Sequence, residues 1–242
     1  MSIVSQHSFG SCALPVRSAI ALRPQGQLHD GDLEDRFAQA PLRRVEAKEL
    51  LFAEGDVVSH LYRIETGSIA LFKVLNDGRR QVMGFAYAGD LIGLGADREH
   101  VMNAQAVKPT RVRCLPAGSV RQAAAKDPAL ALKLYEALAG ELAAMRDLLF
   151  TTGQRNALER VAGFLVALSR RNDRRGDDPT SIQLPMTRTD IGDLLGLTIE
   201  TVSRTFTKLK HLQLIELPQC SHVQLLDIDR LESLADGQAG CV

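Results

Sequence analysis

Short apolar or alternating runs, separated by turn residues, occupy the chain from about residue 45 to 116. The runs are LYRIETG, SIALFKVL, RQVMGFAY and VRCLP, and each has the length of a β-strand. Glycines recur between them at intervals of about a strand plus a turn, at Gly55, Gly67, Gly78 and Gly89. The clearest hairpin signal is Asn76-Asp77-Gly78, because these residue types tolerate positive φ. The pattern predicts an all-β unit with the strand spacing of a sandwich or barrel.

A helical pattern replaces the strands after residue 127. Asp127-Pro128 is a suitable helix start, and from there to about Thr152 apolar residues follow at spacings of three and four. They are Leu130, Leu134, Leu138, Leu142, Met145 and Leu149. Such a stripe can pack on its own β-unit or pair with a second copy. We favour pairing, because paired helices bury these stripes on each other. The predicted seam is Leu134, Leu138, Leu142 and Met145.

A second amphipathic helix is predicted from Gln154 to Arg171. Its apolar face carries Val161, Phe164, Leu165 and Leu168. The following stretch, RRNDRRGDDP at 170–179, mixes charges of both signs, and we expect a solvated loop there.

Two capped helices with a tight turn are predicted between residues 187 and 209. Thr187 can cap the first helix, and Asp190 favours its positive N-terminus. Gly196 stands where the chain must turn, and Thr198 can cap the second helix. Two strands follow at Leu214–Leu217 and Val223–Ile228, joined by residues 218–222. The unit resembles a helix-turn-helix with a wing.

The second of these helices has two contrasting faces. Val202, Phe206 and Leu209 share one face, while Glu200, Ser203, Arg204 and Thr207 share the other. A DNA major groove admits such a helix, and the expected base-reading residues are Ile199, Glu200, Ser203 and Arg204. The alternative is an ordinary exposed surface with an ion pair between Glu200 and Arg204. That alternative explains two residues but not the capped pair of helices with its wing.

Composition restricts the other function classes. The chain has 242 residues with equal numbers of acidic and basic side chains, so a nucleic-acid surface must be local. There is no apolar run of about eighteen residues and no secretory signal, so we expect a cytoplasmic protein without membrane contact. Four separated cysteines fit reduced thiols, and a zinc finger is not expected. A metal-dependent β-barrel enzyme would need clustered His and Glu ligands, which the β-unit lacks.

Residues 186–204, MTRTDIGDLLGLTIETVSR, closely resemble the DNA-binding segment of the Crp/Fnr superfamily of bacterial transcription regulators, in particular its Fnr and FixK-like branches. The segments FAEGD (52–56), YRIETGSI (62–69) and AGDLIG (88–93) resemble the β-roll of the same family. The resemblance implies an α+β fold in five parts. These are an N-terminal arm (1–33), a β-roll sensory domain (34–126), a dimerisation helix (127–152), a winged helix-turn-helix domain (153–236) and a tail (237–242).

The resemblance also implies roles for individual residues. Glu200, Ser203 and Arg204 would read bases, whereas Arg188, Thr198 and Thr201 would contact phosphate. Ile199 stands where cyclic-AMP-responsive members carry an arginine, which favours a TTGA half-site. The expected function is transcription activation, by a homodimer on a TTGA-N6-TCAA-like palindrome in a low-oxygen response, with RNA polymerase as a further partner.

Departures from the family pattern concern cofactors. Cyclic-nucleotide binders hold the phosphate with an Arg-Ser pair, but the corresponding stretch here is Met102-Asn103-Ala104-Gln105. Of the Fnr iron–sulfur ligands, only Cys114 and one arm cysteine, Cys12, have counterparts, and two thiolates do not make the usual four. We interpret Cys114 as a small buried apolar residue.

Haem would require axial ligands from among His7, His29, His60 and His100. We therefore expect no bound cofactor and no metal. The alternative is a sensor of the same superfamily that needs a small molecule, haem or a redox change to bind DNA. Cys220, at the predicted wing tip near His222, is the candidate redox residue.

Overall fold

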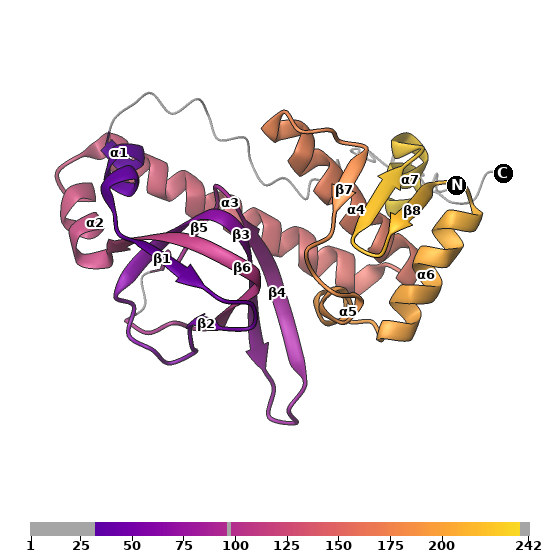
Figure 1. Ribbon diagram of the computed structural model, residues 1–242, viewed down its shortest axis with the longest axis horizontal. Helices are drawn as coiled ribbons and strands as arrows, with labels where there is room; N and C mark the ends of the chain where they lie inside the picture. Colours follow the sequence, from indigo (N-terminus) through magenta and orange to yellow (C-terminus); the bar gives the residue numbers. More distant parts are fainter. Residues whose placement is uncertain (1–31, 96–97, 238–242) are drawn as a thin grey trace, which may run out of the picture.

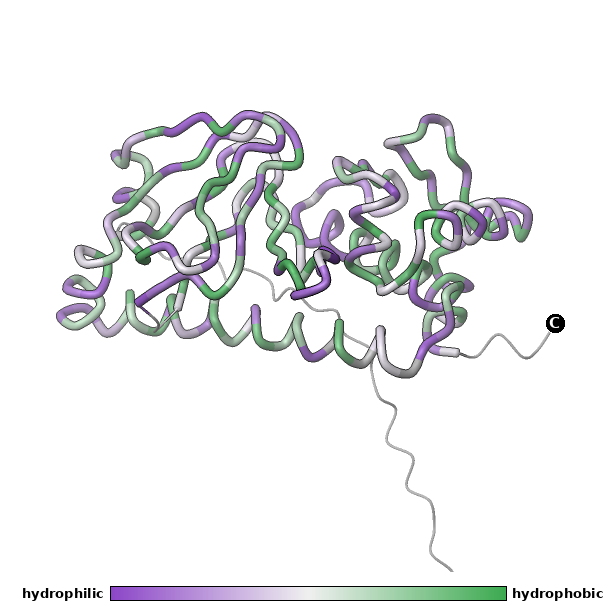
Figure 2. The backbone as a smooth tube through the Cα atoms, turned by 90° about the horizontal axis from the view of Figure 1, so that it is seen from below, coloured by the Kyte–Doolittle hydropathy of each residue, from purple (hydrophilic) through white to green (hydrophobic). Residues whose placement is uncertain are grey.

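The computed structural model describes residues 32–95 and 98–237, which form two domains connected by a long helix (Figure 1). A β-roll makes up the N-terminal domain, and helices with a small sheet make up the C-terminal domain. The long helix, α3 (Pro128–Gln154), runs beneath the roll toward the C-terminal domain (Figure 2). Residues 1–31 and 238–242, which hold most of the predicted arm and tail, lie outside the described residues.

The roll is a six-stranded antiparallel sheet. Its strands are β1 (Leu42–Val45), β2 (Leu50–Phe52), β3 (His60–Val74), β4 (Arg80–Tyr87), β5 (Leu91–Ile92) and β6 (Asn103–Pro116). The order is β1-β6-β3-β4, with β2 also paired to β6 and β5 to β3. Alternating side chains from these strands, among them Val45, Ile64, Ile69 and Val112, form the buried core of the roll.

One predicted strand break is wrong. The runs LYRIETG and SIALFKVL are a single strand, β3, and Gly67 lies inside it at a register shift against β6. Gly67 has φ +98°, and a Cβ there would lie 2.6 Å from the Cα of Thr110. The Thr110 hydroxyl accepts a hydrogen bond from the Ser68 amide at 3.1 Å and holds the irregular pairing together. This glycine is a bulge residue rather than a turn residue.

The hairpin predicted at Asn76-Asp77-Gly78 is confirmed. It connects β3 to β4, with the Leu75 amide donating to the Arg79 carbonyl at 2.8 Å and the Gly78 amide to the Leu75 carbonyl at 2.9 Å. Gly78 has φ +82°, as this turn requires.

Three helices close one end of the roll. They are α1 (Asp32–Gln39), α2 (Ala117–Ala124) and the first turns of α3. Phe37, Val120 and Leu130 from these helices pack together in one cluster. The predicted start of α3 is confirmed, because the Asp127 carboxylate accepts hydrogen bonds from the amides of Ala129 at 2.9 Å and Leu130 at 3.2 Å.

The next helix begins and ends later than predicted, because Gln154 still belongs to α3. Helix α4 spans Ala157–Arg175, so six of the ten residues of the expected loop at 170–179 are helical. Gly176, with φ +74°, ends the helix in a left-handed conformation. The arginines of this stretch are also not free in solvent, because Arg170 pairs with Glu232 at 2.8 Å and Arg171 with Asp90 at 3.5 Å.

The remaining elements form the C-terminal domain around α4. They are β7 (Ser181–Gln183), α5 (Arg188–Leu195), α6 (Ile199–His211), β8 (Ile215–Gln219), β9 (His222–Leu225) and α7 (Ile228–Ala235). The prediction that the second wing strand reaches Ile228 is wrong. It ends at Leu225, because the Asp227 carboxylate caps a new helix by accepting from the Arg230 amide at 2.9 Å.

Helix α3 presents apolar residues on two adjoining faces. Leu130 and Leu134 pack against the cluster that closes the roll, and Met145 lines a cavity beside the roll. Leu138 and Leu142 remain 41% and 50% exposed. Leu149, which the predicted pattern included but the predicted seam did not, and Tyr135, which neither included, extend the same exposed stripe. The four residues predicted as a seam are therefore divided between the exposed stripe and the protein's own interior.

Candidate nucleic-acid interface

Local hydrogen bonds build the helix-turn-helix as the sequence predicts. The Thr187 hydroxyl accepts from the Asp190 amide at 3.1 Å, and the Asp190 carboxylate accepts from the Thr187 amide at 2.9 Å. This reciprocal capping box fixes the start of α5. The Thr198 hydroxyl accepts from the Thr201 amide at 3.2 Å and starts α6.

The turn between α5 and α6 depends on two glycines. Gly196 has φ +65° and ends α5. A Cβ on Gly192 would lie 2.5 Å from the carbonyl oxygen of Leu197, so α5 and the turn are in close contact there. Arg160 of α4 supports the same turn by donating to the Leu195 carbonyl at 2.9 Å.

Helix α6 separates buried from exposed residues as predicted. Val202, Phe206 and Leu209 are buried in the C-terminal core. The predicted base-reading residues are all exposed on this one helix: Ile199, Glu200, Ser203 and Arg204. The last turn adds the basic residues Lys208, Lys210 and His211. The helix therefore offers a polar outer face with cations toward its C-terminus.

The polar and charged groups on the exposed face of α6 remain available to bind a partner. The Ser203 hydroxyl donates back to the Ile199 carbonyl at 2.8 Å, which leaves its oxygen lone pairs facing outward. Among the described residues, no ion pair joins Glu200 to Arg204, so the surface-pair alternative has no support in the structure. The Glu200 carboxylate can accept hydrogen bonds from a partner outside the protein, and the Arg204 guanidinium can donate them.

The three residues predicted to contact phosphate have different surroundings. Thr198 and Thr201 share a hydrogen bond between their hydroxyls at 3.0 Å at the start of α6. Arg188 is half-buried, with its guanidinium 3.6 Å from the centre of the Phe206 ring. Burial lowers the pKa of Arg188, although the side chain remains cationic. The stacking fixes the Arg188 side chain between α5 and α6.

The wing is a tight hairpin of β8 and β9, next to β7 in the order β7-β9-β8. Cys220 is exposed at its tip, as predicted. His222, however, does not face Cys220, because its Nε2 is 2.9 Å from the Ser181 hydroxyl on β7. The charged neighbour of Cys220 is Arg188, which the sequence prediction did not pair with it.

Contacts from the roll hold the helix-turn-helix from outside. Arg80 of β4 donates to Asp190 at 2.6 Å and pairs with Asp193 at 3.4 Å. Gln81 donates to the Asp193 carbonyl at 2.8 Å. These residues are 110 or more positions from their partners, and no motif indicated them. Phe72 and Val82 of the roll also belong to the apolar core of the C-terminal domain.

A second contact between the domains surrounds Arg171. Its guanidinium lies 4.2 Å from the centre of the Tyr87 ring and pairs with Asp90. Burial raises the pKa of both Tyr87 and Asp90. Arg175 adds a hydrogen bond to the Ala88 carbonyl. The two domains therefore share a substantial, partly charged interface.

The donor groups for a metal or haem are dispersed in the described residues. No group of three or more His, Cys, Asp or Glu side chains there could hold a metal ion. Cys114 packs against the roll core, where burial raises the pKa of its thiol, whereas Cys220 belongs to the wing. These two thiols cannot share a cluster. Cys12, Cys241, His7 and His29 lie outside the described residues.

The two histidines of the roll are already engaged. His100 stacks on Phe52 with ring centres 3.6 Å apart, and burial lowers its pKa. His60 hydrogen-bonds the Ser59 hydroxyl at 2.9 Å. This donor set does not fit an iron–sulfur cluster or a haem with two protein ligands.

Comparison with known proteins agrees with this architecture. A family model for a cyclic nucleotide-binding domain matches residues 42–127, and one for a Crp-like helix-turn-helix domain matches residues 159–234. The nitrogen fixation regulation protein FixK of Bradyrhizobium diazoefficiens is 37% identical over 77% of this chain and 78% of its own length. The chain belongs to the Crp/Fnr family, in its FixK-like branch.

Other relatives of this Crp/Fnr regulator extend the match. The transcriptional activatory protein AadR of Rhodopseudomonas palustris is 37% identical over 87% of each chain. The structure of FixK2 from Bradyrhizobium japonicum superposes with a TM-score of 0.77 at 35% identity, covering 81% of this chain and 96% of FixK2. The Crp/Fnr chain is thus a DNA-binding transcription regulator and not an enzyme. Within its described residues, no helix is long and apolar enough to cross a membrane.

Proposed function

We propose that two copies of the chain bind a TTGA-N6-TCAA-like palindrome and activate transcription from it. The observation that supports this is the outer face of α6, where Glu200, Ser203 and Arg204 are exposed directly opposite a buried apolar face. A helix presented in this way, with a capped N-terminus, fits the major groove of B-DNA.

Each exposed side chain has a partner among the bases of TTGA and its complement. Arg204 donates two hydrogen bonds to O6 and N7 of the guanine, and Glu200 accepts from the N4 amine of a cytosine. Ile199, which is 45% exposed, packs on a thymine methyl. Ser203 supplies a small acceptor whose own proton is held by the Ile199 carbonyl.

Phosphate contacts position the helix in the groove. Thr198 and Thr201 lie at its start, where amides and hydroxyls favour an anion. Arg188, held against Phe206, contributes a cation of fixed position. These contacts supply affinity without sequence preference.

The exposed stripe of α3 serves dimerisation. Tyr135, Leu138, Leu142 and Leu149 recur at the spacing of a paired-helix seam, and a solvated stripe of this size would be costly in a monomer. Two copies joined along α3 present two reading helices to successive turns of one DNA face.

The names of the relatives support a role in low-oxygen gene regulation. FixK is named for nitrogen fixation regulation, and a protein of Salmonella typhi that is 33% identical over 86% of this chain is named for fumarate and nitrate reduction. Activation would require contact with RNA polymerase, and binding to chromosomal DNA would place the protein in the cytoplasm.

A second candidate function is a regulator that needs a small-molecule effector. It is favoured by a cavity of about 750 Å³ beside α3, whose walls include side chains from both domains. The two candidates differ in whether purified protein binds the palindrome without additions.

The test is titration of the purified full-length chain against labelled duplexes. One duplex carries the palindrome, a second carries a single half-site, and a third separates the half-sites by about five more base pairs, half a helical turn. We expect two chains per palindrome and a large loss of affinity on the other duplexes. Equal affinity for all three would contradict the proposal, and binding only after an effector is added would favour the second candidate.

A further inference from the structure

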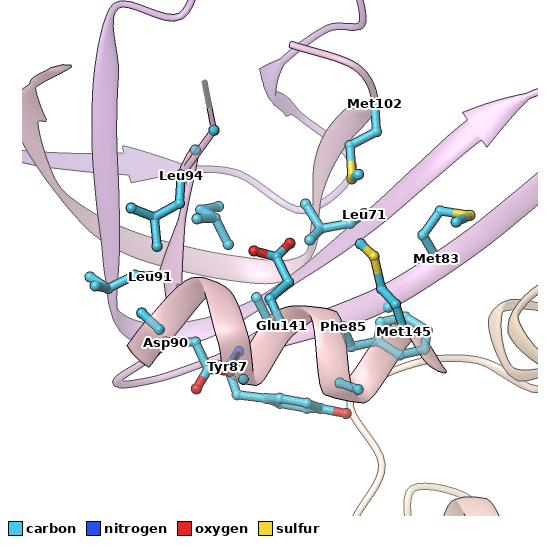
Figure 3. Close-up of a pocket in the computed structure, with 18 of the residues that line it drawn as sticks. Leu71, Met83, Phe85, Tyr87, Asp90, Leu91, Leu94, Met102, Glu141 and Met145 are labelled. Atoms are coloured by element: carbon cyan, nitrogen blue, oxygen red, sulfur yellow. Dashed lines mark hydrogen bonds between the residues drawn. The ribbon is translucent and has the colours of Figure 1, made fainter. Parts of the chain in front are cut away.

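A large cavity lies between the roll and α3 (Figure 3). Its volume of about 750 Å³ is within the range of small-molecule sites, roughly 300 to 1,000 Å³. Strands β3 to β5 form one wall and α3 forms the opposite wall.

The lining is mostly apolar and rich in sulfur. Leu71, Met83, Phe85, Leu91, Met102 and Met145 face the cavity in Figure 3. Methionine side chains adapt their shape to a neighbour and contact aromatic rings favourably. A wall of this kind suits an apolar ligand, including a ligand with an aromatic ring.

The Glu141 carboxyl group interrupts the apolar side chains that α3 presents to the cavity. Glu141 projects from α3 into the cavity among Leu71, Met145 and the other apolar side chains (Figure 3). Among the described residues it has no hydrogen-bond or ion-pair partner, and burial raises its pKa. A partly buried carboxyl group without a partner loses hydration, and a ligand with a complementary group would offset that loss.

The two arginines of the cavity wall are already paired with carboxylates of the protein. Arg63 pairs with Glu65 at 2.8 Å, and Arg171 pairs with Asp90. Lys133 lies two helical turns before Glu141, about 12 Å along the axis. The cavity therefore does not offer an anion the cluster of free cations that a phosphate needs.

Asn103 and Gln105 lie in the stretch that corresponds to the phosphate-binding pair of cyclic-nucleotide receptors, and both already make hydrogen bonds within the protein. The Asn103 side chain donates to the Phe72 carbonyl at 3.3 Å and accepts from the Glu54 amide at 3.1 Å. Gln105 donates to the Lys48 carbonyl at 2.9 Å. Their polar atoms hold the roll together and are not directed at a ligand.

From this geometry we propose that the cavity binds a small apolar amine, whose nitrogen pairs with the Glu141 carboxyl group while its hydrocarbon part contacts the methionines, Leu71 and Phe85. The inference rests on the second candidate function, because it names the chemical class of the molecule that this cavity would take, and it is independent of how α6 reads DNA. An amine and a carboxyl group share one proton in the bound pair, so the charge stays balanced inside the apolar cavity whichever group holds it.

The experiment uses three probes with the same ring and different polar groups: 2-naphthylmethylamine, 2-naphthalenemethanol and 2-naphthoate. The chain contains no tryptophan, so naphthalene fluorescence reports binding without overlap from tryptophan emission. The full-length protein is compared with Glu141→Gln, which removes the charge but keeps the shape. Ala144→Leu fills the cavity from the same helix face, and Glu136→Gln is the control, an exposed carboxylate at the cavity edge.

We expect one amine per chain, bound at least about tenfold more tightly than the alcohol or the acid. Glu141→Gln should abolish this preference without changing alcohol binding, whereas Glu136→Gln should change amine affinity by less than about twofold. Ala144→Leu should weaken all three probes. Circular dichroism and binding to the TTGA palindrome, measured on the same samples, separate a folding defect or a failure of DNA recognition from failure of this proposal.

Two results would overturn the proposal. One is equal affinity of the wild-type protein for the three probes, or no binding of any of them. The other is a preference for the amine that survives in Glu141→Gln, which would place the amine elsewhere.

Discussion

Arg80 and Asp190 are joined by a hydrogen bond of 2.6 Å between Nη1 and Oδ1, although they are 110 residues apart. Arg80 belongs to the β-roll, and Asp190 completes the capping box that starts α5. The Arg80 guanidinium also lies 4.3 Å from the centre of the Phe72 ring. The roll thus contacts the first helix of the DNA-reading unit through the carboxylate that also fixes the start of that helix.

We expect Arg80→Ala to lower the free energy of unfolding by about 1.5 to 3 kcal/mol, because it leaves two half-buried carboxylates without their cation. The matched control is Arg79→Ala. Arg79 pairs with Asp77 at 2.7 Å on the open hairpin, and its side chain is 77% exposed, so its loss should cost less than about 0.5 kcal/mol. Urea unfolding measures both variants. Equal losses would mean that the pair between the domains contributes no more than a surface pair.

Acid should act in opposite ways on the two aspartates that share Arg80. Burial alone would raise the pKa of Asp190, but hydrogen bonds from Thr187 and Arg80 lower it below its ordinary value. For Asp193 burial dominates over the charge of Arg80, and its pKa is raised. Asp190 therefore stabilises the fold above its unfolded pKa of about 3.9, and this contribution is lost as pH falls through the lower folded value. The folded protein binds a proton at Asp193 more readily than the unfolded chain does. Asp193 therefore adds stability as the pH falls through its raised folded-state pKa.

Urea unfolding of Asp190→Asn and Asp193→Asn between about pH 3 and 6 tests these signs. The destabilisation by Asp190→Asn should be largest near pH 6 and shrink toward pH 3. Asp193→Asn should be neutral or stabilising at pH 6 and approach the wild type in acid. Parallel pH profiles for the two variants would contradict the assignment.

Local signals in the sequence predicted the reading unit well. Thr187, Gly196 and Thr198 act through neighbours within a few residues, so their roles as caps and turn are visible in the sequence. The two faces of α6 follow from helical periodicity in the same way. Prediction was weaker for Gly67, because a glycine that allows a bulge and one that ends a strand look alike until the partner strand is known.

Long-range contacts could not be predicted. Nothing near Arg80 or Gln81 in the sequence indicates that their partners lie on α5. Arg170 and Arg171 looked like a solvated charged stretch, because their partners Glu232 and Asp90 are distant in the chain. Similarly, periodicity alone could not divide the apolar residues of α3 between the roll and an exposed stripe.

The exposed stripe leads to a prediction about assembly. Leu138→Glu should place a charge in the seam, weaken dimerisation and with it DNA binding, because both half-sites must be held together. The control is Leu132→Glu on the same helix, since Leu132 is 57% exposed but lies off the stripe. Sedimentation equilibrium gives the dimer dissociation constant. A Leu138→Glu protein that remains dimeric like the control would rule out this seam.

Oxidation of the wing should weaken DNA binding. Cys220 is exposed at the tip, close enough to Arg188 for their charges to interact. Peroxide oxidation of its thiol to the sulfinic acid would add a negative charge beside the DNA backbone. We expect peroxide to reduce the palindrome affinity of the wild-type protein and to leave Cys220→Ser much less affected. An equal loss in both proteins would assign the effect to another cysteine.

The central claim is that α6 reads the bases of TTGA, and a double-mutant cycle on Arg204 tests it most directly. Wild type and Arg204→Ala are titrated against the palindrome and against a duplex in which the guanine of each half-site is replaced. Arg204→Ala should cost about 1 to 3 kcal/mol on the palindrome and remove the preference for guanine, whereas Arg188→Ala should weaken both duplexes alike and reduce the salt dependence. If Arg204→Ala lost the same affinity on both duplexes, Arg204 would contact only phosphate and the reading assignment would be wrong.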